Sequence, residues 1–185
     1  MNAPAPMALV RLMQLVSPAL PVGAYTYSQG LEWAVESGRI RNETSAGEWI
    51  GDLMQHCIGR FEAPLVAALM QHWASGNTKE IARLNADFLA SRESAELRAE
   101  TAQMGFSLNR LLNDLGVPVL TTLRTQLAGL PEIAFPTVWS GLAAAWRIEP
   151  YDAVCGYLWA WAENQVMAAL KAVPLGQAAG QRLLS

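Results

Sequence analysis

Apolar residues recur at steps of three and four along almost the whole of this chain, the spacing that places them on one face of an α-helix. Between residues 95 and 115, for example, Leu97, Met104 and Leu108 fall on one such face. No stretch of four to eight residues shows the alternation of β-branched and polar side chains that is typical of a strand. The pattern therefore predicts an all-α protein.

The chain has 185 residues and contains no internal repeat, low-complexity block or linker. A chain of this length buries enough surface for one domain, so we expect a single domain over residues 1–185. Short connections between the expected helices favour antiparallel neighbours. We therefore predict a compact helical bundle of about eight to ten helices.

Proline, glycine and capping residues set the expected helix ends. Ser17-Pro18 ends a first helix and Gly38 ends a second. Ser45 and Glu48 have the spacing of a capping box, which places a helix start there. Pro64 suits the first turn of a new helix. The expected helices cover residues 9–16, 31–37, 45–61, 64–73, 81–89, 95–115, 118–128, 136–146 and 151–173.

The composition excludes several classes of protein. Hydrophobic residues make up 52% of the chain and charged residues 16%, which rules out a disordered chain. The formal net charge is −3, so no positive field exists to hold the phosphates of DNA or RNA.

Targeting and membrane signals are equally sparse. Residues 1–7 lack the basic start and long apolar stretch of a secretory signal. The longest run near the C-terminal end without a charge or amide, residues 153–162, is far shorter than the roughly twenty apolar residues of a bilayer span. We expect a soluble cytoplasmic protein that binds neither membranes nor nucleic acid.

The groups that catalysis requires are scarce. The sequence has no GxxxxGK[ST] phosphate loop, GxSxG elbow or HExxH zinc motif, and it has two histidines. His56 and Cys57 are helix neighbours that point about 100° apart, so they do not easily chelate one metal. His56 meets His72 only if the helices flanking Pro64 fold back on each other. A structural metal site therefore stays an alternative to ordinary partly buried histidines, and we expect no cofactor and no enzymatic activity.

The two cysteines, Cys57 and Cys155, form no CxxC pair and indicate a reducing compartment. Because each has apolar neighbours in the sequence, we expect both to be core thiols.

Three further features leave alternatives open. The charged run from Arg92 to Glu100 suits either a clamp for a ligand or partner or a solvated helix face. Trp159 and Trp161 cannot both face one core strip of a helix. Residues 117–162 carry only five charges, so another chain covers these helices, a second copy being the simplest choice, or they lie buried at the centre of the bundle.

Three segments resemble one known family. Residues 12–32 contain the run Ser17-Pro18-Ala19-Leu20-Pro21-Val22-Gly23-Ala24-Tyr25-Thr26-Tyr27-Ser28-Gln29-Gly30-Leu31-Glu32 and resemble the N-terminal signature of the urease accessory protein UreF. Residues 91–100 and 166–177 resemble two later UreF segments, in the same order. The resemblance covers essentially the whole chain.

The resemblance implies an all-helical, dimeric, non-catalytic cytoplasmic protein. UreF joins the accessory protein UreD, also called UreH, and the nickel-carrying GTPase UreG, and the assembly helps to deliver nickel to apo-urease. Two alternatives are a GTPase activator that donates an arginine finger to UreG, and a nickel-binding chaperone. The candidates for these roles are Arg39, Arg41 and Arg98 for the finger, and His56, Cys57 and His72 for nickel.

The resemblance also implies site residues. Glu32 and Lys171 match family positions that engage the GTPase, and we hypothesise that they come close together at the rim of the partner surface. Tyr27, Ser28 and Gln29 belong to the same signature loop and share that surface. The remaining polar family positions are Arg98 and Gln177.

Family chains usually continue past Ser185, and the segment 181–185 looks like the middle of a helix. The resemblance implies that the missing tail helps to bind UreD. A chain without it is expected to bind UreD weakly or not at all.

Overall fold

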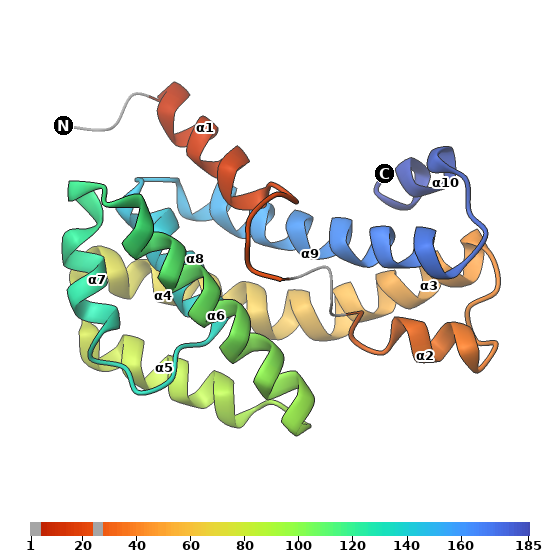
Figure 1. The fold of residues 1–185 in the computed structure, drawn as a ribbon, viewed down its shortest axis with the longest axis horizontal. Helices are drawn as coiled ribbons and strands as arrows, with labels where there is room; N and C mark the ends of the chain where they lie inside the picture. Colours follow the sequence, from red (N-terminus) through yellow and green to blue (C-terminus); the bar gives the residue numbers. More distant parts are fainter. Residues whose placement is uncertain (1–4, 24–27) are drawn as a thin grey trace.

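The computed structural model describes residues 5–23 and 28–185, and over these ranges every regular element is a helix (Figure 1). The elements are α1 (Ala5–Val16), α2 (Leu31–Glu36), α3 (Glu43–Leu53), the π-helix η2 (Met54–Glu62), α4 (Ala63–Ser75), α5 (Thr78–Ala90), α6 (Ala95–Leu115), the 3-10 turn η3 (Pro118–Leu120), α7 (Thr121–Leu127), α8 (Phe135–Ala145), α9 (Pro150–Ala172) and α10 (Gln177–Leu183). The prediction of an all-α bundle is confirmed.

Local signals account for several helix ends. α6 begins behind Ser94, whose hydroxyl accepts a hydrogen bond from the Leu97 N–H, and it ends at Gly116 with a φ of +59°. The side chain of Asn77 caps α5 in the same way as Ser94 caps α6. The predicted bounds of the helix over 95–115 are therefore confirmed.

The predicted start of the third helix was wrong. α3 begins behind Asn42, whose side chain accepts a hydrogen bond from the Ser45 N–H at 3.0 Å, and the Ser45 hydroxyl accepts one from the Asn42 N–H. Ser45 is thus the third residue of the helix and not its cap. Serine can play either part in a reciprocal cap, so its presence alone does not fix the register.

The new helix expected at Pro64 is confirmed as α4, but no turn separates it from the preceding helices, because α3, η2 and α4 follow one another directly. Pro64 lies in the first turn of α4, where a missing N–H is tolerated. The π-helical turns before it change the hydrogen-bond register of the backbone. A Cβ on Gly59 would lie 2.7 Å from the Met54 carbonyl oxygen, so this stretch packs its own backbone closely.

The continuity of this helix separates the two histidines. His56 and His72 stand sixteen positions apart on it, a separation of about 24 Å along the axis at the usual rise per residue. They do not fold back to share a metal. Within the described ranges no group of three or more His, Cys, Asp or Glu side chains is arranged to hold one.

α8 lies at the centre of the molecule and packs against α4 and α6. Val138 and Trp139 are fully buried in it, and the Trp73 indole N–H donates to the Ser140 hydroxyl at 3.2 Å. The chain enters α8 so close to α6 that a Cβ on Gly105 would collide with the Ile133 carbonyl oxygen. Burial at the centre therefore explains the lack of charge over 135–145.

The buried apolar residues form two separate clusters, which we call the large core and the small core. The large core includes Leu15, Val22, Leu69, Phe88, Leu108, Trp139 and Tyr157. The small core consists of Leu31, Ala34, Ile40, Ala46, Ile50, Val166, Ala169 and Val173. Figure 1 shows the helices of the small core, α2, α3, α10 and the second half of α9, gathered at one end.

Three segments pass from one core to the other. They run from Val22 to Leu31, from Ile50 to Leu65 and from Tyr157 to Val166. The first is the connection between α1 and α2, the second contains η2, and the third is the middle of α9. The buried carboxylates Glu62 and Glu100 lie at the junction where they cross.

The prediction that both cysteines are core thiols was wrong, because Cys57 and Cys155 are both exposed. Apolar neighbours in the sequence did not reveal which face of the helix each cysteine occupies. Cys155 lies on the face of α9 that carries Tyr151 and Trp159, one turn away on either side.

Candidate functional site

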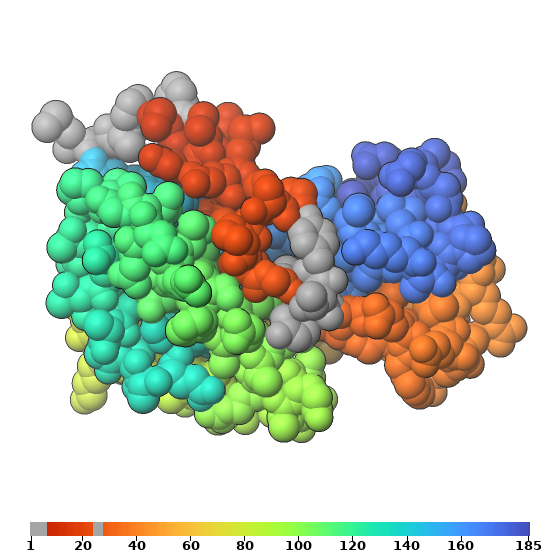
Figure 2. All heavy atoms as spheres, in the orientation of Figure 1, coloured from red at the N-terminus to blue at the C-terminus, as the bar shows by residue number. Residues whose placement is uncertain are grey.

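A pocket of about 110 Å³ lies at the junction of the two cores. Its walls come from the segment between α1 and α2, from α6 and from α9, and from the side chains of Glu62 and Arg92. Figure 2 shows the described residues that follow α1 (red-orange) on the surface of the molecule, and the small-core end (orange and dark blue) farther along the long axis.

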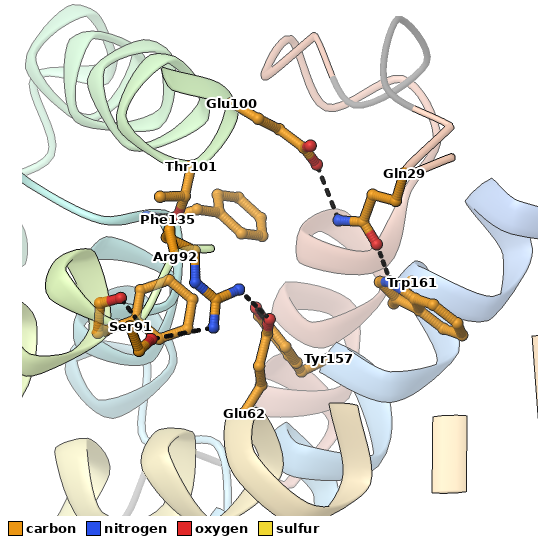
Figure 3. A network of polar contacts seen from close by, with 10 residues as sticks. Gln29, Glu62, Ser91, Arg92, Glu100, Thr101, Phe135, Tyr157 and Trp161 are labelled. Atoms are coloured by element: carbon orange, nitrogen blue, oxygen red, sulfur yellow. Dashed lines mark hydrogen bonds and ion pairs between the residues drawn. The ribbon is translucent and has the colours of Figure 1, made fainter. Parts of the chain in front are cut away.

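A buried carboxylate ties three elements together on one side of the pocket (Figure 3). Glu62, 7% exposed, accepts a hydrogen bond from the Tyr157 hydroxyl at 2.6 Å and forms an ion pair with Arg92 at 3.0 Å. The Arg92 guanidinium also lies 4.1 Å from the ring centroid of Phe88. Burial, together with the Glu62 charge, holds the pKa of Tyr157 well above its ordinary value, so this hydroxyl stays a donor.

Gln29 uses both ends of its side-chain amide on the other side of the pocket (Figure 3). Its Nε2 donates to Glu100 Oε1 at 2.9 Å, and its Oε1 accepts from Trp161 Nε1 at 2.8 Å. Glu100, 8% exposed, has its pKa raised by burial, an effect that the hydrogen bond from Gln29 partly offsets. Arg92 and Glu100 are thus engaged inside the molecule, so the charged run over 92–100 is not simply a solvated face.

Ser28 and Glu32 form the start of α2. The Ser28 carbonyl accepts a hydrogen bond from the Leu31 N–H at 3.0 Å, and its hydroxyl lies 3.5 Å from the Glu32 nitrogen. Glu32 itself is exposed in the first turn of α2. The local turn therefore presents a carboxylate to solvent close in sequence to the half-buried Gln29.

Lys171 and Gln177 lie at the same end of the molecule. Lys171 is exposed in the last turn of α9, against which both α2 and α10 pack, and Gln177 is the exposed first residue of α10. The fold thus brings the helices of Glu32 and Lys171 side by side. That their charged groups come close together stays a prediction.

The other two predicted site residues have different outcomes. Arg98 lies on α6, where it forms an ion pair with Glu132 at 2.5 Å and donates to the Leu89 carbonyl at 3.5 Å. These contacts tie α6 to the end of α5 and to the segment before α8. Tyr27 lies outside the described residues.

Sequence reasoning missed Glu62 and Tyr157, and it named Gln29 without predicting its contact with Trp161. Nothing in the sequence distinguishes Glu62 from the other acidic residues on helices. The tryptophan pair did carry a signal, because the prediction that Trp159 and Trp161 face different ways is confirmed: Trp161 contacts Gln29, and Trp159 is 44% exposed.

A second hollow, of about 670 Å³, lies between α1 and α9, and we call it the α1/α9 groove. Leu9, Met13 and Trp159 line it with largely exposed apolar side chains. Its rim carries charges of both signs, from Arg147 and from Glu149 and Asp152. Part of the charge-poor region over 117–162 thus does face outward.

Two of the three candidate finger arginines are held by contacts within their own turn. The Arg39 guanidinium lies 5.1 Å from the Trp33 ring centroid, and Arg41 donates to the Gly38 carbonyl. Arg98 is engaged with Glu132, as described above.

No helix in the described ranges is long and apolar enough to span a bilayer.

Comparison with known proteins identifies relatives along nearly the whole chain. The sequence model of the UreF family matches residues 40–185. The urease accessory protein UreF of Dechloromonas aromatica is 71% identical over 177 residues, which are 96% of this chain and 78% of that protein. The UreF proteins of Azoarcus sp. and Methylobacillus flagellatus are 63% and 49% identical over 96% of this chain and 76% and 78% of their own lengths.

These relatives are accessory proteins and not enzymes, and the all-helical fold with an interior engaged in its own hydrogen bonds and ion pairs suits that class. The chain belongs to the UreF family of urease accessory proteins. The resemblance seen in the sequence is confirmed.

Proposed function

We propose that the chain is a non-catalytic scaffold of urease maturation, which acts in the cytoplasm with UreD/UreH and the GTPase UreG to assist nickel delivery into apo-urease. Membership of the UreF family supports an accessory role. The scaffold acts through its surface, and its partners supply the nucleotide chemistry.

The exposed face at the small-core end carries the contact with UreG. This face, which we call the α2/α9 face, consists of the exposed residues Glu32, Lys171 and Gln177 together with the half-buried Ser28. The single observation that carries the assignment is the placement of Glu32 and Lys171 on packed neighbouring helices, α2 and α9, both exposed. Exposed charges at an interface rim set specificity and encounter rate more than they set total affinity.

Capture of UreG by this chain tests the proposal. Glu32→Ala and Lys171→Ala are each expected to weaken capture by about tenfold, because each removes a charge from the contact. Asp114→Ala and Lys79→Ala are matched controls, since both side chains are exposed on helices of the large core. Equal capture by the wild type and by both α2/α9 variants would reject the face.

Gln29 and Arg98, which the resemblance also assigned to partner binding, enter this function differently. Gln29 faces inward with its amide, and Arg98 lies beside Glu132 at the α5/α6 end. We infer that Arg98 contributes through its ion pair, by holding α6 in place. The GTPase activator gains no support, because the three candidate arginines are engaged within the chain.

The scaffold works as a homodimer, and the α1/α9 groove is the place for the second copy. α1 is apolar nearly all round, with only Arg11 and Gln14 as polar side chains after its first turn, and such a helix needs cover on both faces. In a two-fold contact each copy presents Arg147 to the partner's acidic rim, so a surface with both signs complements itself.

A further inference from the structure

The connection between α1 and α2 joins the two cores. Val22 is buried in the large core and Leu31 in the small core, so both ends of this connection are anchored, each in a different cluster. The other two crossing segments are helical, and one of them contains η2. The connection between α1 and α2 is thus the third tie at the junction.

Among the described residues of this connection, Gln29 contacts both sides. Glu100 belongs to α6, whose buried apolar residues lie in the large core, and Trp161 packs against the small core. The backbone of Gln29 has a φ of +50° and is followed by Gly30 at +87°. Two left-handed residues in succession turn the chain sharply into α2.

The left-handed conformation of Gln29 is informative because glutamine rarely adopts it. Arg147 is the other non-glycine residue with positive φ in the described ranges. A strained backbone persists where surrounding contacts overdetermine it, and here both hydrogen bonds of the amide depend on the turn. The left-handed conformation of Gln29 and its hydrogen bonds to Glu100 and Trp161 therefore stabilise each other.

We propose that Gln29 is a positioning residue: through its hydrogen bonds to Glu100 and Trp161 it fixes α2 relative to α6, and so sets the orientation of the α2/α9 face. The inference rests on the proposed function in one respect, namely that the α2/α9 face binds UreG. Glu100 and Trp161 then contribute to the orientation of the α2/α9 face through Gln29, although neither residue lies on that face.

The hydrogen bond between Gln29 and Glu100 has a donor on Gln29 and an acceptor on Glu100, so exchanging the two side chains tests it. Gln29→Glu places a second carboxylate against Glu100 and removes the donor. Combining it with Glu100→Gln restores a donor opposite an acceptor, with the roles exchanged, and the carboxylate introduced at position 29 still accepts from Trp161 Nε1. A residue that only fills space would not show such rescue.

Hydrogen exchange of the α2 backbone amides measures the positioning in the free chain, and capture of UreG measures its consequence. We expect Gln29→Glu to speed exchange of α2 and to weaken capture, each by about tenfold or more, because a buried acceptor loses its donor. The double variant is expected to return both to within about threefold of the wild type. Gln29→Met, which keeps the length and lacks the amide, is expected to resemble Gln29→Glu and serves where the latter fails to fold.

Two results would overturn the positioning role. The first is hydrogen exchange of the α2 amides that is unchanged in both Gln29→Glu and Gln29→Met. The second is a double variant whose α2 amides exchange as fast as those of Gln29→Glu. The failure of the proposed function looks different. In that case Glu32→Ala and Gln29→Glu both leave UreG capture unchanged. Hydrogen exchange of the α2 amides is still faster in Gln29→Glu and is still restored in the double variant, and this result supports the positioning role.

Discussion

Tyr157 and Glu62 show how single residues hold the junction. The Tyr157 hydroxyl donates to a carboxylate that is almost entirely buried. Removing the donor leaves the second oxygen of Glu62 without this partner in a place that water does not readily reach, which is more costly than losing an exposed hydrogen bond.

Tyr157→Phe is therefore expected to lower the free energy of unfolding by about 1–3 kcal/mol, as measured in urea. Tyr151→Phe is the matched control, because the Tyr151 side chain is 79% exposed, and its effect is expected to stay within about 0.5 kcal/mol. Equal effects of the two substitutions would contradict the role of the buried hydrogen bond.

The buried Glu100 carboxyl predicts a dependence of stability on pH. Burial raises its pKa above the ordinary value of 4.5, an effect that neighbouring Glu62 adds to, and Gln29 and Arg92 oppose. An acid with a raised pKa in the folded chain holds its proton more tightly there, so its ionisation opposes folding. This cost is absent below the unfolded pKa and grows as the pH rises to the folded pKa.

Glu100→Gln cannot ionise and so escapes this cost. We expect its free energy of unfolding, relative to that of the wild type, to increase as the pH rises through the ordinary pKa of 4.5 and to level off above the raised pKa of the folded chain. The exposed Glu93→Gln provides the reference, with a relative stability that changes little over the same range. A relative stability of Glu100→Gln that falls with pH would show that the carboxylate is favoured by folding.

At the scale of elements, the contact between α6 and α8 depends on Gly105. A Cβ there would collide with the Ile133 carbonyl oxygen and approach the Ala134 carbonyl carbon at 3.0 Å. Both neighbours are backbone atoms of the entry into α8, which cannot move aside as a flexible side chain can. The Asn85 amide fixes the same entry by donating to the Glu132 carbonyl and accepting from the Ala134 N–H.

Gly105→Ala is thus expected to lower the free energy of unfolding by about 1–3 kcal/mol in spite of the better helix propensity of alanine. Gly51→Ala in α3 meets nothing within 4 Å and is expected to raise it by about 0.5–1 kcal/mol. Denaturant titrations of the two variants check this difference in sign.

For the whole molecule, the proposed dimer predicts that a charge in the α1/α9 groove is disruptive. Met13, 62% exposed, lies on the lining of the groove. Met13→Asp is expected to weaken self-association by about 100-fold or more, because the contact would bury an unpaired carboxylate. Sedimentation equilibrium measures the effect.

Phe106→Asp is the control, since Phe106 is similarly exposed, at 60%, but lies on α6 away from the groove. A dimer that survives Met13→Asp, or one that Phe106→Asp also breaks, would place the second copy elsewhere.

Much of the element pattern followed from the sequence alone. Apolar spacing and capping residues fixed the helix over 95–115, because capping and periodicity act within a few residues along the chain. The same local rules erred at Ser45, where a reciprocal cap was equally compatible with the residues. They placed Pro64 correctly in a first helical turn but did not reveal the π-helical stretch before it. They also erred for Cys57 and Cys155, because apolar neighbours do not reveal the outward face.

The family and the positions of its signature residues were likewise readable in the sequence, whereas the junction was decided by tertiary structure. Gln29 meets Glu100 across 71 positions and Trp161 across 132, and Glu62 meets Tyr157 across 95. Periodicity marks which side of a helix turns inward but not which other helix it meets. Only packing in three dimensions determines which polar groups share a buried site. A buried polar group without a hydrogen-bond partner is destabilising, and the tertiary fold decides which partner lies within reach.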